Sequence, residues 1–531
     1  MKETLKGLIM VNRFTFILIT TLFFFTFTVN AAPNKALFTT YDIVTPFVLS
    51  QPIISANLIH NDNDNEELIA IGVDENKQTW VAIYGINQES NRYQLIKKLS
   101  IPKKYFAYDV SEFDETDITK VRKLYFLSKD DVARLSITPS NDDIGSRNTS
   151  FVVEQKITSM YLVNSADFIN QIDFIKDINE DGIDDIYLSH FETLNLWLSQ
   201  CCGHYHHQAL PLPSFVEHDN KQVTFNQRAL FFADYNLDRK KDIAWIKQGS
   251  IEYFAQSNEG LFLTTSQPIA INESIYGLNW WDIRESDGDS LDQSQLSHRN
   301  VEKISDVNGD GIVDLVVRFT QSSGVLDRVN DYEFYFGKTQ HNQVKKSQVV
   351  SFSEQADTVV KAEGTLTGLN IVDINNDNKF EVMVSSFELS VTNIIGALIS
   401  GGIDQNVLLF AINKDSQFSA KPIISKEVEL RFSLTKGRSG QPMVQLADVN
   451  GDGLKDLVLS DDDDTINVYA GQEGKRQFAK KALKQELRLA KDGQFIQHYD
   501  INRDGKQDFI MSYTRLDEPK LINTFTVIIA N

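Results

Sequence analysis

An acidic segment of nine residues recurs along this chain of 531 residues, and a short apolar run follows each copy. The segment places Asp at positions 1 and 5, Asn at position 3 and a carboxylate at position 9. Most copies also have Gly at position 6. This spacing constrains both the chemistry and the architecture of the chain. The copies begin at Asp177, Asp234, Asp306, Asp373, Asp448 and Asp500.

The spacing of oxygen donors predicts Ca²⁺ loops. Ca²⁺ takes about six to eight oxygen ligands, and position 7 would add a backbone carbonyl. Gly suits the sharp turn at position 6, Asn378 is a tolerable substitute there, and Arg239 is a poor one. The alternative is that Asp, Asn and Gly only form turns, although a turn does not require a carboxylate again at position 9. The spacing is not that of an EF-hand, which needs Glu at position 12.

We expect at least four of the six loops to bind Ca²⁺, led by those at Asp177, Asp306, Asp448 and Asp500. The predicted ligands are Asp177, Asn179, Asp181, Asp185, Asp234, Asn236, Asp238, Asp242, Asp306, Asn308, Asp310, Asp314, Asp373, Asn375, Asp377, Glu381, Asp448, Asn450, Asp452, Asp456, Asp500, Asn502, Asp504 and Asp508.

The loops recur every 52 to 75 residues, which is a period typical of stacked supersecondary units such as propeller blades. Each interval is predicted to hold four short strands rich in aromatic and β-branched residues. Around Asp234 the predicted strands cover residues 229–233, 242–246, 250–254 and 260–264. The acidic loop would therefore join the first and second strands of each unit.

Two degenerate units, at residues 61–67 and 114–117, precede the clear ones and bring the total to eight. The last unit lacks a fourth strand, and a spare strand lies within residues 37–49. Pairing that strand with residues 524–528 would remove an exposed sheet edge. The prediction is an all-β fold, an eight-bladed β-propeller closed by its own termini. A seven-bladed propeller, with the unit at residue 114 as an insertion, is the alternative.

These loops resemble those of the FG-GAP, or VCBS, repeat family, whose propellers are related to the head domain of integrin α chains. The resemblance is strongest at residues 177–185, 306–314 and 448–456 and weakest before residue 177. It implies Ca²⁺ on one face of the propeller and a ligand at the opposite face. The Phe-Gly and Gly-Ala-Pro pieces that name the family are mostly missing here, which puts integrin-like partners in doubt.

The N-terminus predicts export. Lys2, Lys6 and Arg13 flank an apolar run over residues 14–29, and a small-x-small cleavage site follows at Ala31. We therefore expect a signal peptide over residues 1–31 and a single propeller domain over 32–531. The mature chain would have no transmembrane helix and be periplasmic, cell-surface or secreted; an uncleaved anchor is the alternative.

The formal charge of −21 argues against nucleic acid and anionic membranes as partners. The two cysteines are adjacent, Cys201 and Cys202, and His204, His206 and His207 follow. We interpret this segment as an exposed turn or a vicinal disulfide between the third and fourth strands of one unit. A Zn²⁺ or Cu site is the alternative.

Three insertions interrupt the repeat, at residues 280–299, 321–331 and 387–403, and all are expected on the face opposite the acidic loops. Loops on a rigid scaffold often carry function, so this face is the predicted site for a protein or glycan ligand. The apolar segment 387–403 is interpreted as a helix or hairpin over the propeller mouth, with an exposed patch for a partner as the alternative.

No sequence motif indicates catalysis: the chain has no nucleophile elbow, no HExxH and no phosphate-binding Gly loop. The favoured function is that of an exported, calcium-binding, non-catalytic module for binding or assembly. The alternative is a calcium-dependent carbohydrate-active protein, either a polysaccharide lyase or a lectin, because propellers host all of these functions.

Overall fold

The computed structural model describes residues 36–531 apart from short internal segments, and residues Leu37–Asn531 form one compact unit. The described residues are strands and loops, and their only helical elements are 3₁₀ turns of three residues: η2 (Trp280–Asp282), η3 (Gln293–Gln295), η4 (Gly493–Phe495) and η5 (Pro519–Leu521). The segments outside the description are residues 1–35, 51, 59–64, 88, 91, 113–120, 140–146, 201–202, 220–221, 284–290, 325–327, 343–346, 389–401, 434–437, 462–463 and 475.

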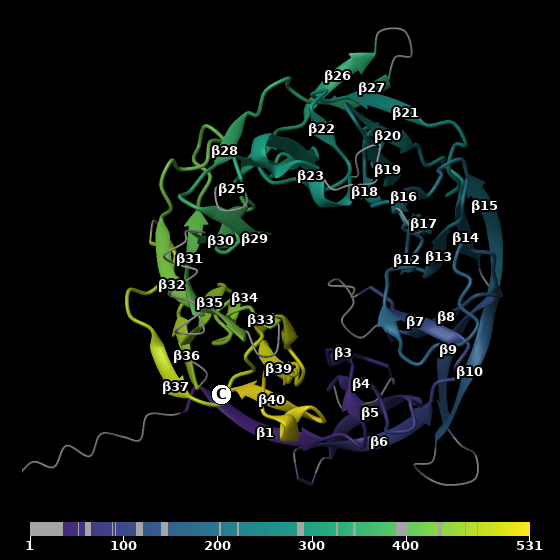
Figure 1. Cartoon of the computed structure of the whole chain (residues 1–531), viewed down its shortest axis with the longest axis vertical. Coiled ribbons are helices and arrows are strands. Elements are labelled where there is room, and N and C mark those ends of the chain that lie inside the picture. Colours follow the sequence, from purple (N-terminus) through teal and green to yellow (C-terminus); the bar gives the residue numbers. More distant parts are fainter. Residues whose placement is uncertain are drawn as a thin grey trace, which may run out of the picture. The chain divides into compact units, whose positions relative to one another are not determined.

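The strands form mainly antiparallel sheets that, apart from β1, follow one another in chain order, so the predicted all-β class is confirmed (Figure 1). The first sheets comprise β2 (Val48–Leu49), β3 (Ile54–Ala56), β4 (Glu67–Val73), β5 (Thr79–Asn87) and β6 (Arg92–Ser100); then β7 (Tyr105–Val110), β8 (Leu124–Ser128), β9 (Asp131–Pro139), β10 (Arg147–Lys156) and β11 (Asn170–Gln171); then β12 (Ile175–Lys176), β13 (Asp185–Ser189), β14 (Leu194–Gln200) and β15 (His204–Leu210).

The next sheets hold β18 (Phe231–Ala233), β19 (Asp242–Lys247), β20 (Ser250–Phe254) and β21 (Gln267–Ala270), followed by a large sheet of β22 (Ile275–Tyr276), β23 (Leu296–Ser305), β24 (Asp314–Ser322), β25 (Arg328–Tyr335), β28 (Thr358–Val360), β29 (Thr365–Val372), β30 (Glu381–Phe387), β31 (Gly402–Phe410), β32 (Ile424–Ser433) and β33 (Arg438–Gly440). A single residue pair, Asn330 with Thr365, joins β25 to β29, so this large sheet consists of two weakly connected parts.

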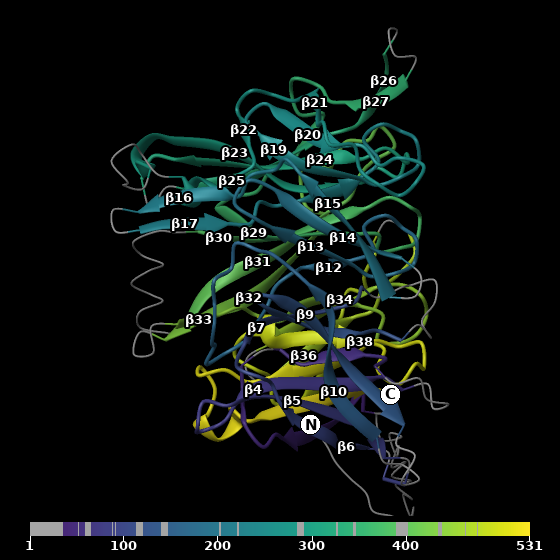
Figure 2. The ribbon, with the colours of Figure 1, turned by 90° about the vertical axis from the view of Figure 1, so that its right-hand side faces the viewer.

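The last sheets hold β34 (Val444–Ala447), β35 (Asp456–Asp461), β36 (Thr465–Tyr469) and β37 (Leu483–Glu486), and then β38 (Ile496–Tyr499), β39 (Asp508–Ser512), β40 (Thr524–Ala530) and β1 (Phe38–Val44). Two hairpins lie outside these sheets and project on different sides in Figure 2: β16 (Phe215–Asp219) with β17 (Gln222–Asn226), and β26 (Lys338–Asn342) with β27 (Ser347–Ser351).

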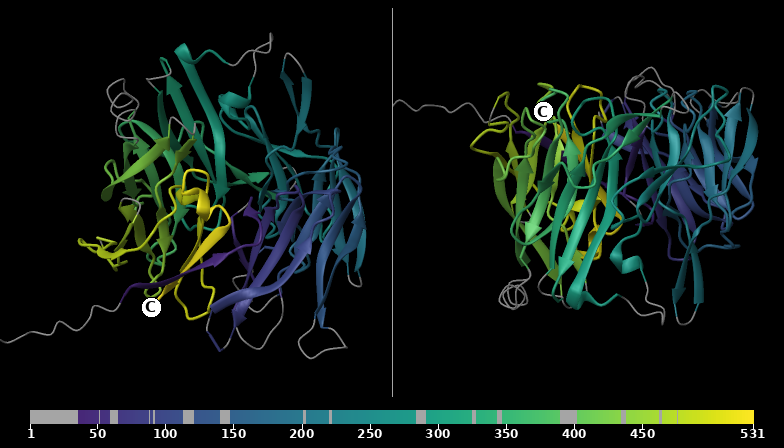
Figure 3. Two further views of the ribbon diagram at one scale, coloured as in Figure 1. Left: turned by 60° about the horizontal axis from the view of Figure 1, so that its bottom comes forward. Right: turned by 90° about the horizontal axis from the view of Figure 1, so that it is seen from above.

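The N-terminal strand pairs with the last strand of the chain, as the sequence predicted (Figure 3). β1 runs antiparallel to β40, from the pair Phe38–Ala530 to the pair Val44–Thr524. Arg488 adds an ion pair at 2.6 Å to Asp42, which also accepts a hydrogen bond from Thr526. The sheet that contains the C-terminus is therefore completed by the first described strand.

The second strand of each sheet alternates its side chains between two hydrophobic clusters. In β24, Leu315 and Val317 belong to the cluster shared with β19 and β20, whereas Val316 belongs to the cluster shared with β30 and β31. Both faces of such a strand are covered, which explains why its sequence is a continuous apolar run rather than an alternation. Successive side chains alternate between two hydrophobic clusters in the same way in β4, β8, β13, β19, β30, β35 and β39.

The clusters link each sheet to the next, and the last sheet to the first. Phe509 of β39 shares a cluster with Val458 of β35, whereas Ile510 shares one with Leu68 and Ala70 of β4. Tyr84 of β5 and Phe525 of β40 add an edge-to-face aromatic contact at 5.3 Å between the first sheet and the last.

The predicted strand over residues 260–264 is wrong. The fourth strand of that sheet is β21 (Gln267–Ala270), and Phe262 makes only an isolated bridge to Gln256. The segment is apolar because Phe262 is buried between two sheets. Phe418 and Phe478 make equivalent bridges after β31 and β36 and are also buried.

Several predictions fall outside the described residues: the signal peptide over 1–31, most of the degenerate loops at 61–67 and 114–117, and the cysteines 201–202. Within the insertion at 387–403, residues 389–401 also lie outside the description. In the part of the chain that is described, no helix has the length and apolar character needed to cross a membrane.

Removing β1 should destabilise the fold. A chain that begins after Leu49 would expose the edge of β40 and uncover Phe509, against which Phe38 packs at 5.9 Å. We expect aggregation or rapid limited proteolysis and a lower urea midpoint. A synthetic peptide of residues 37–49 should restore part of the stability, because it can refill the same edge. A truncated chain as stable as a chain of residues 32–531 would contradict this pairing.

Candidate functional site: the acidic loops

Each of the six acidic loops connects the first two of three consecutive strands that pair as antiparallel neighbours, as predicted. They lead from β12 to β13, β18 to β19, β23 to β24, β29 to β30, β34 to β35 and β38 to β39. Position 9 is in every case the first residue of the second strand. The loops therefore stand at equivalent ends of successive sheets.

Each loop is held by hydrogen bonds from its own backbone to its side-chain oxygens. In the loop at Asp306, the amides of Asp310 and Gly311 donate to the two carboxylate oxygens of Asp306, at 3.2 and 2.8 Å. The amide of Ile312 donates to Asp310 Oδ1 at 2.8 Å. The other loops repeat this arrangement closely.

Two positions of each loop adopt left-handed backbone, although the sequence indicated only one. Position 6 has φ between 60° and 86°, and Arg239 holds this conformation at 71° despite its Cβ. Position 4 is also left-handed, at Glu180, Leu237, Gly309, Asn376, Gly451 and Arg503. Sequence gave no signal for position 4 because only two of these six residues are Gly.

The carboxylate at position 9 ties the loop to the third strand. Asp314 accepts the amide of Val307 at 2.8 Å on one oxygen and the amide of Gly337, just after β25, at 2.9 Å on the other. Asp185, Asp242, Asp456 and Asp508 repeat this clip. Glu381 uses its longer side chain to reach Ile374 and the Gln477 side chain. Position 9 thus has a structural role of its own.

The position 9 carboxylates are buried close to other negative charges. Asp185, Asp242, Asp314, Asp456 and Asp508 have no exposed surface. Burial, together with repulsion from the carboxylates at positions 1 and 5, raises the pKa of Asp185 and of Asp508 from 3.8 to about 7. The same causes raise the pKa of Asp242 to about 7 and that of Asp456 to about 6.

Position 7 divides the loops into two groups. Lys240 lies 3.6 Å from Asp238, and Lys506 lies 3.8 Å from Asp504, so a cationic side chain already stands beside position 5 in these two loops. The loop at Asp373 also has a Lys at position 7, whereas the loops at Asp177, Asp306 and Asp448 have Ile or Leu there.

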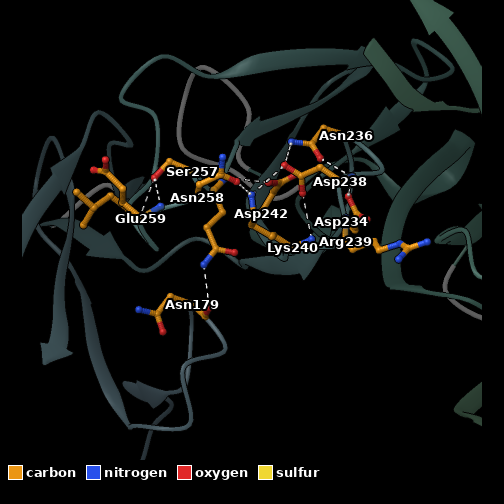
Figure 4. Close-up of polar contacts among 12 residues, drawn as sticks. Asn179, Asp234, Asn236, Asp238, Arg239, Lys240, Asp242, Ser257, Asn258 and Glu259 are labelled. Carbon is orange, nitrogen blue, oxygen red and sulfur yellow. Dashed lines mark hydrogen bonds and ion pairs between the residues drawn. The ribbon is translucent and has the colours of Figure 1, made fainter. Parts of the chain in front are cut away.

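Figure 4 shows the loop at Asp234, where Asn236 and Asp238 face each other and Arg239 points away from them. The Asn236 amide donates to Asp238 Oδ2 at 3.2 Å. Neighbouring sheets contact these loops, because Gln256 donates to the backbone oxygen of Asn179 at 2.8 Å. Asn376 likewise donates to the Gly453 oxygen at 2.6 Å in the next loop.

The oxygen atoms of the loops are of the chemical type that a hard divalent cation binds. It consists of carboxylate, amide and backbone oxygens, which Ca²⁺ prefers over the nitrogen and sulfur ligands that suit Zn²⁺. Among the described residues, however, no three His, Cys, Asp or Glu side chains converge to form a metal site by themselves. Ca²⁺ coordination would therefore draw on Asn at position 3 and a backbone carbonyl in addition to the carboxylates.

The histidines after the two cysteines lie on a strand rather than in a turn. β15 begins at His204, and the His207 ring packs 5.1 Å from that of Trp197 and lies 3.3 Å from Asn195 Oδ1. The three insertions lie at the strand ends remote from the acidic loops, at the start of β23, between β24 and β25, and between β30 and β31.

No family model and no curated protein matches the chain. Solved structures that align with it include an Agrocybe aegerita lectin specific for non-reducing terminal N-acetylglucosamine, at 12% identity over 84% of this chain and 96% of that one, with a TM-score of 0.39. The V. cholerae biofilm matrix protein Bap1 aligns at 10% identity over 94% and 92%, with a TM-score of 0.35. At TM-scores below 0.5 these likenesses carry no conclusion about this chain.

Without divalent cations, the protein should become more stable as the pH falls from 8 towards 6. The position 9 carboxylates have folded-state pKa values of about 6 to 7, above the ordinary 3.8. Between those values the native state binds more protons than the unfolded state, so stability is lost as the pH rises through the folded pKa. Thermal unfolding in EDTA across this range measures the effect. A melting temperature that falls on acidification would contradict it.

Proposed function

We propose that residues Leu37–Asn531 form an eight-bladed β-propeller of the FG-GAP type, closed by β1. The support is the succession of hydrophobic clusters, in which every sheet packs on the next and the sheet of β38–β40 packs on that of β2–β6. The large sheet supplies two blades, one built on β23–β25 and one on β29–β32. The pairing of β1 with β40 completes the last blade.

The acidic loops of this propeller bind Ca²⁺. The observation that carries this proposal is the recurrence, six times, of one loop geometry in which oxygens at positions 1, 3 and 5 lie close to a buried carboxylate at position 9, whose pKa is raised by burial and further by repulsion from its acidic neighbours. A divalent cation between positions 1, 3 and 5 would relieve that repulsion. The loops at Asp177, Asp306 and Asp448 bind most tightly, because no Lys competes beside position 5.

The protein acts as an exported binding or assembly module, and its ligand meets the face remote from the acidic loops. That end of the sheets carries the insertions, including Trp281, which is 43% exposed and lies under the Arg318 guanidinium at 5.7 Å. Export to a calcium-rich compartment suits loops of moderate affinity, since extracellular modules bind Ca²⁺ with a Kd of about 10⁻⁴–10⁻³ M.

Neutralising position 5 in the three strongest loops should remove most of the stabilisation by Ca²⁺. In the triple variant Asp181→Asn, Asp310→Asn and Asp452→Asn, each Asn still accepts the amide of position 7, so the loops should fold. Saturating Ca²⁺ stabilises by about 2.7 kcal/mol per site at a hundredfold excess over Kd. We expect a clear rise in melting temperature for the wild type and a much smaller rise for the variant.

The matched control is the double variant Asp238→Asn and Asp504→Asn, in the loops with Lys at position 7. It should lose less of the Ca²⁺ response than the triple variant. In EDTA the triple variant should melt no lower than the wild type, because removing a carboxylate at position 5 relieves repulsion with position 9. An equal Ca²⁺ response in wild type and triple variant would refute the assignment of the loops. Turnover of a uronate polysaccharide by the purified wild type would instead refute the non-catalytic role.

A further inference from the structure

A cavity of about 500 Å³ lies at the end of the sheets remote from the acidic loops. Its walls come from β29, β30 and β31, from the start of β34 and from the segment just before β38. Three successive sheets therefore contribute to one cavity. The volume falls within the range of about 300–1,000 Å³ that is usual for small-molecule sites.

A β-bulge in β29 shapes one wall of this cavity. The register of β29 against β30 shifts between Thr367 and Asn370, and Gly368 in the bulge has φ of +63°. A Cβ at Gly368 would meet nothing closer than Ser385 Oγ at 3.8 Å, so the conformation rather than crowding explains the Gly. Bulges often re-aim side chains beside binding sites, and here the bulge lies in the cavity wall.

The described lining carries no charged side chain. Its polar groups are amides and hydroxyls, among them Asn370, Ser385, Gln405, Gln441 and Gln494. Amides carry donors and acceptors, as sugar hydroxyls do, whereas an anionic ligand would call for a cationic partner. Apolar surface from Met383, Phe387, Leu430 and Pro442 adjoins these groups and suits the C–H faces of a pyranose ring.

Gln405 is a buried polar residue of the cavity lining. It is 1% exposed, and its Oε1 atom has no hydrogen-bond partner in the protein. A buried acceptor without a partner costs free energy, and a ligand hydroxyl that donated to Oε1 would remove that cost. Gln445, in contrast, is fixed by β38, because His498 Nδ1 lies 3.0 Å from its Oε1 and its Nε2 donates to the Ile496 oxygen at 3.3 Å.

We propose that this cavity binds a neutral sugar residue of a glycan, with Gln405 Oε1 accepting a hydrogen bond from a sugar hydroxyl. The inference rests on the proposed function in that it identifies the ligand class and the site of the binding module. A peptide is the competing ligand. It is disfavoured because three sheets bound the cavity and its lining consists of amides, hydroxyls and short apolar surfaces, without a charged partner for a peptide terminus.

The test uses the mature, Ca²⁺-saturated protein on a glycan array that contains neutral glycans, uronate-containing glycans and control peptides, followed by calorimetry with the best neutral glycan. We expect retention on neutral glycans. The variant Gln405→Met keeps the volume but removes the acceptor, and it should bind at least about tenfold more weakly. Gln494 is an exposed residue of the lining, and Gln494→Ala should weaken binding by a smaller factor. This second variant tests the cavity even if Gln405→Met fails to fold.

Gln472→Met, an equal change at an exposed Gln outside the cavity, should bind as the wild type does. The proposal is overturned if the wild type retains no neutral glycan, if only uronates or peptides bind, or if Gln405→Met binds as tightly as the wild type. The melting temperature with and without Ca²⁺ is measured on the same samples. A normal Ca²⁺ response without glycan binding would refute this inference alone, whereas loss of the Ca²⁺ response would refute the proposed function.

Discussion

The structure depends on one recurring interaction, the buried carboxylate at the start of the second strand of a sheet. In the sheet of β38–β40, Asp508 accepts the amide of Ile501 from the acidic loop and that of Ala530 from β40, the strand that pairs with β1. One side chain thus fixes the loop to β40, a strand of the closing pair. Its full burial is possible because both oxygens accept hydrogen bonds.

The same carboxylate is buried beside other negative charges, and the repulsion between them has an electrostatic cost. Positions 1 and 5 place two more acidic groups beside it, and repulsion adds to burial in raising its pKa. Protonation, a Lys at position 7 or a divalent cation would each relieve the repulsion. Lys240 and Lys506 place a cationic side chain at position 7 and so relieve part of the repulsion in their loops. The loops at Asp177, Asp306 and Asp448 have no Lys at position 7, so a divalent cation would relieve the repulsion most there.

Much of the fold follows from the sequence, because the loop spacing, the apolar runs after it and the spare N-terminal strand are local patterns. The strand expected at residues 260–264 was wrong, since the burial of Phe262 between two sheets gives the same apolar signal as a strand. The sequence also did not reveal the backbone hydrogen bonds that the carboxylate at position 9 accepts. These bonds explain why a carboxylate stands at position 9 even without a bound cation. The Gln405 cavity draws on three sheets, and no local pattern could have revealed it.

The central claim is that repeated carboxylate clusters hold Ca²⁺ at one end of successive sheets. Native mass spectrometry of residues 32–531, after exchange into dilute Ca²⁺ at neutral pH, counts the bound ions in a single measurement. The account predicts at least four Ca²⁺ per chain, lost together on treatment with EDTA. A protein that carries less than one Ca²⁺ per chain would contradict it and leave the acidic loops as turns fixed by their own hydrogen bonds.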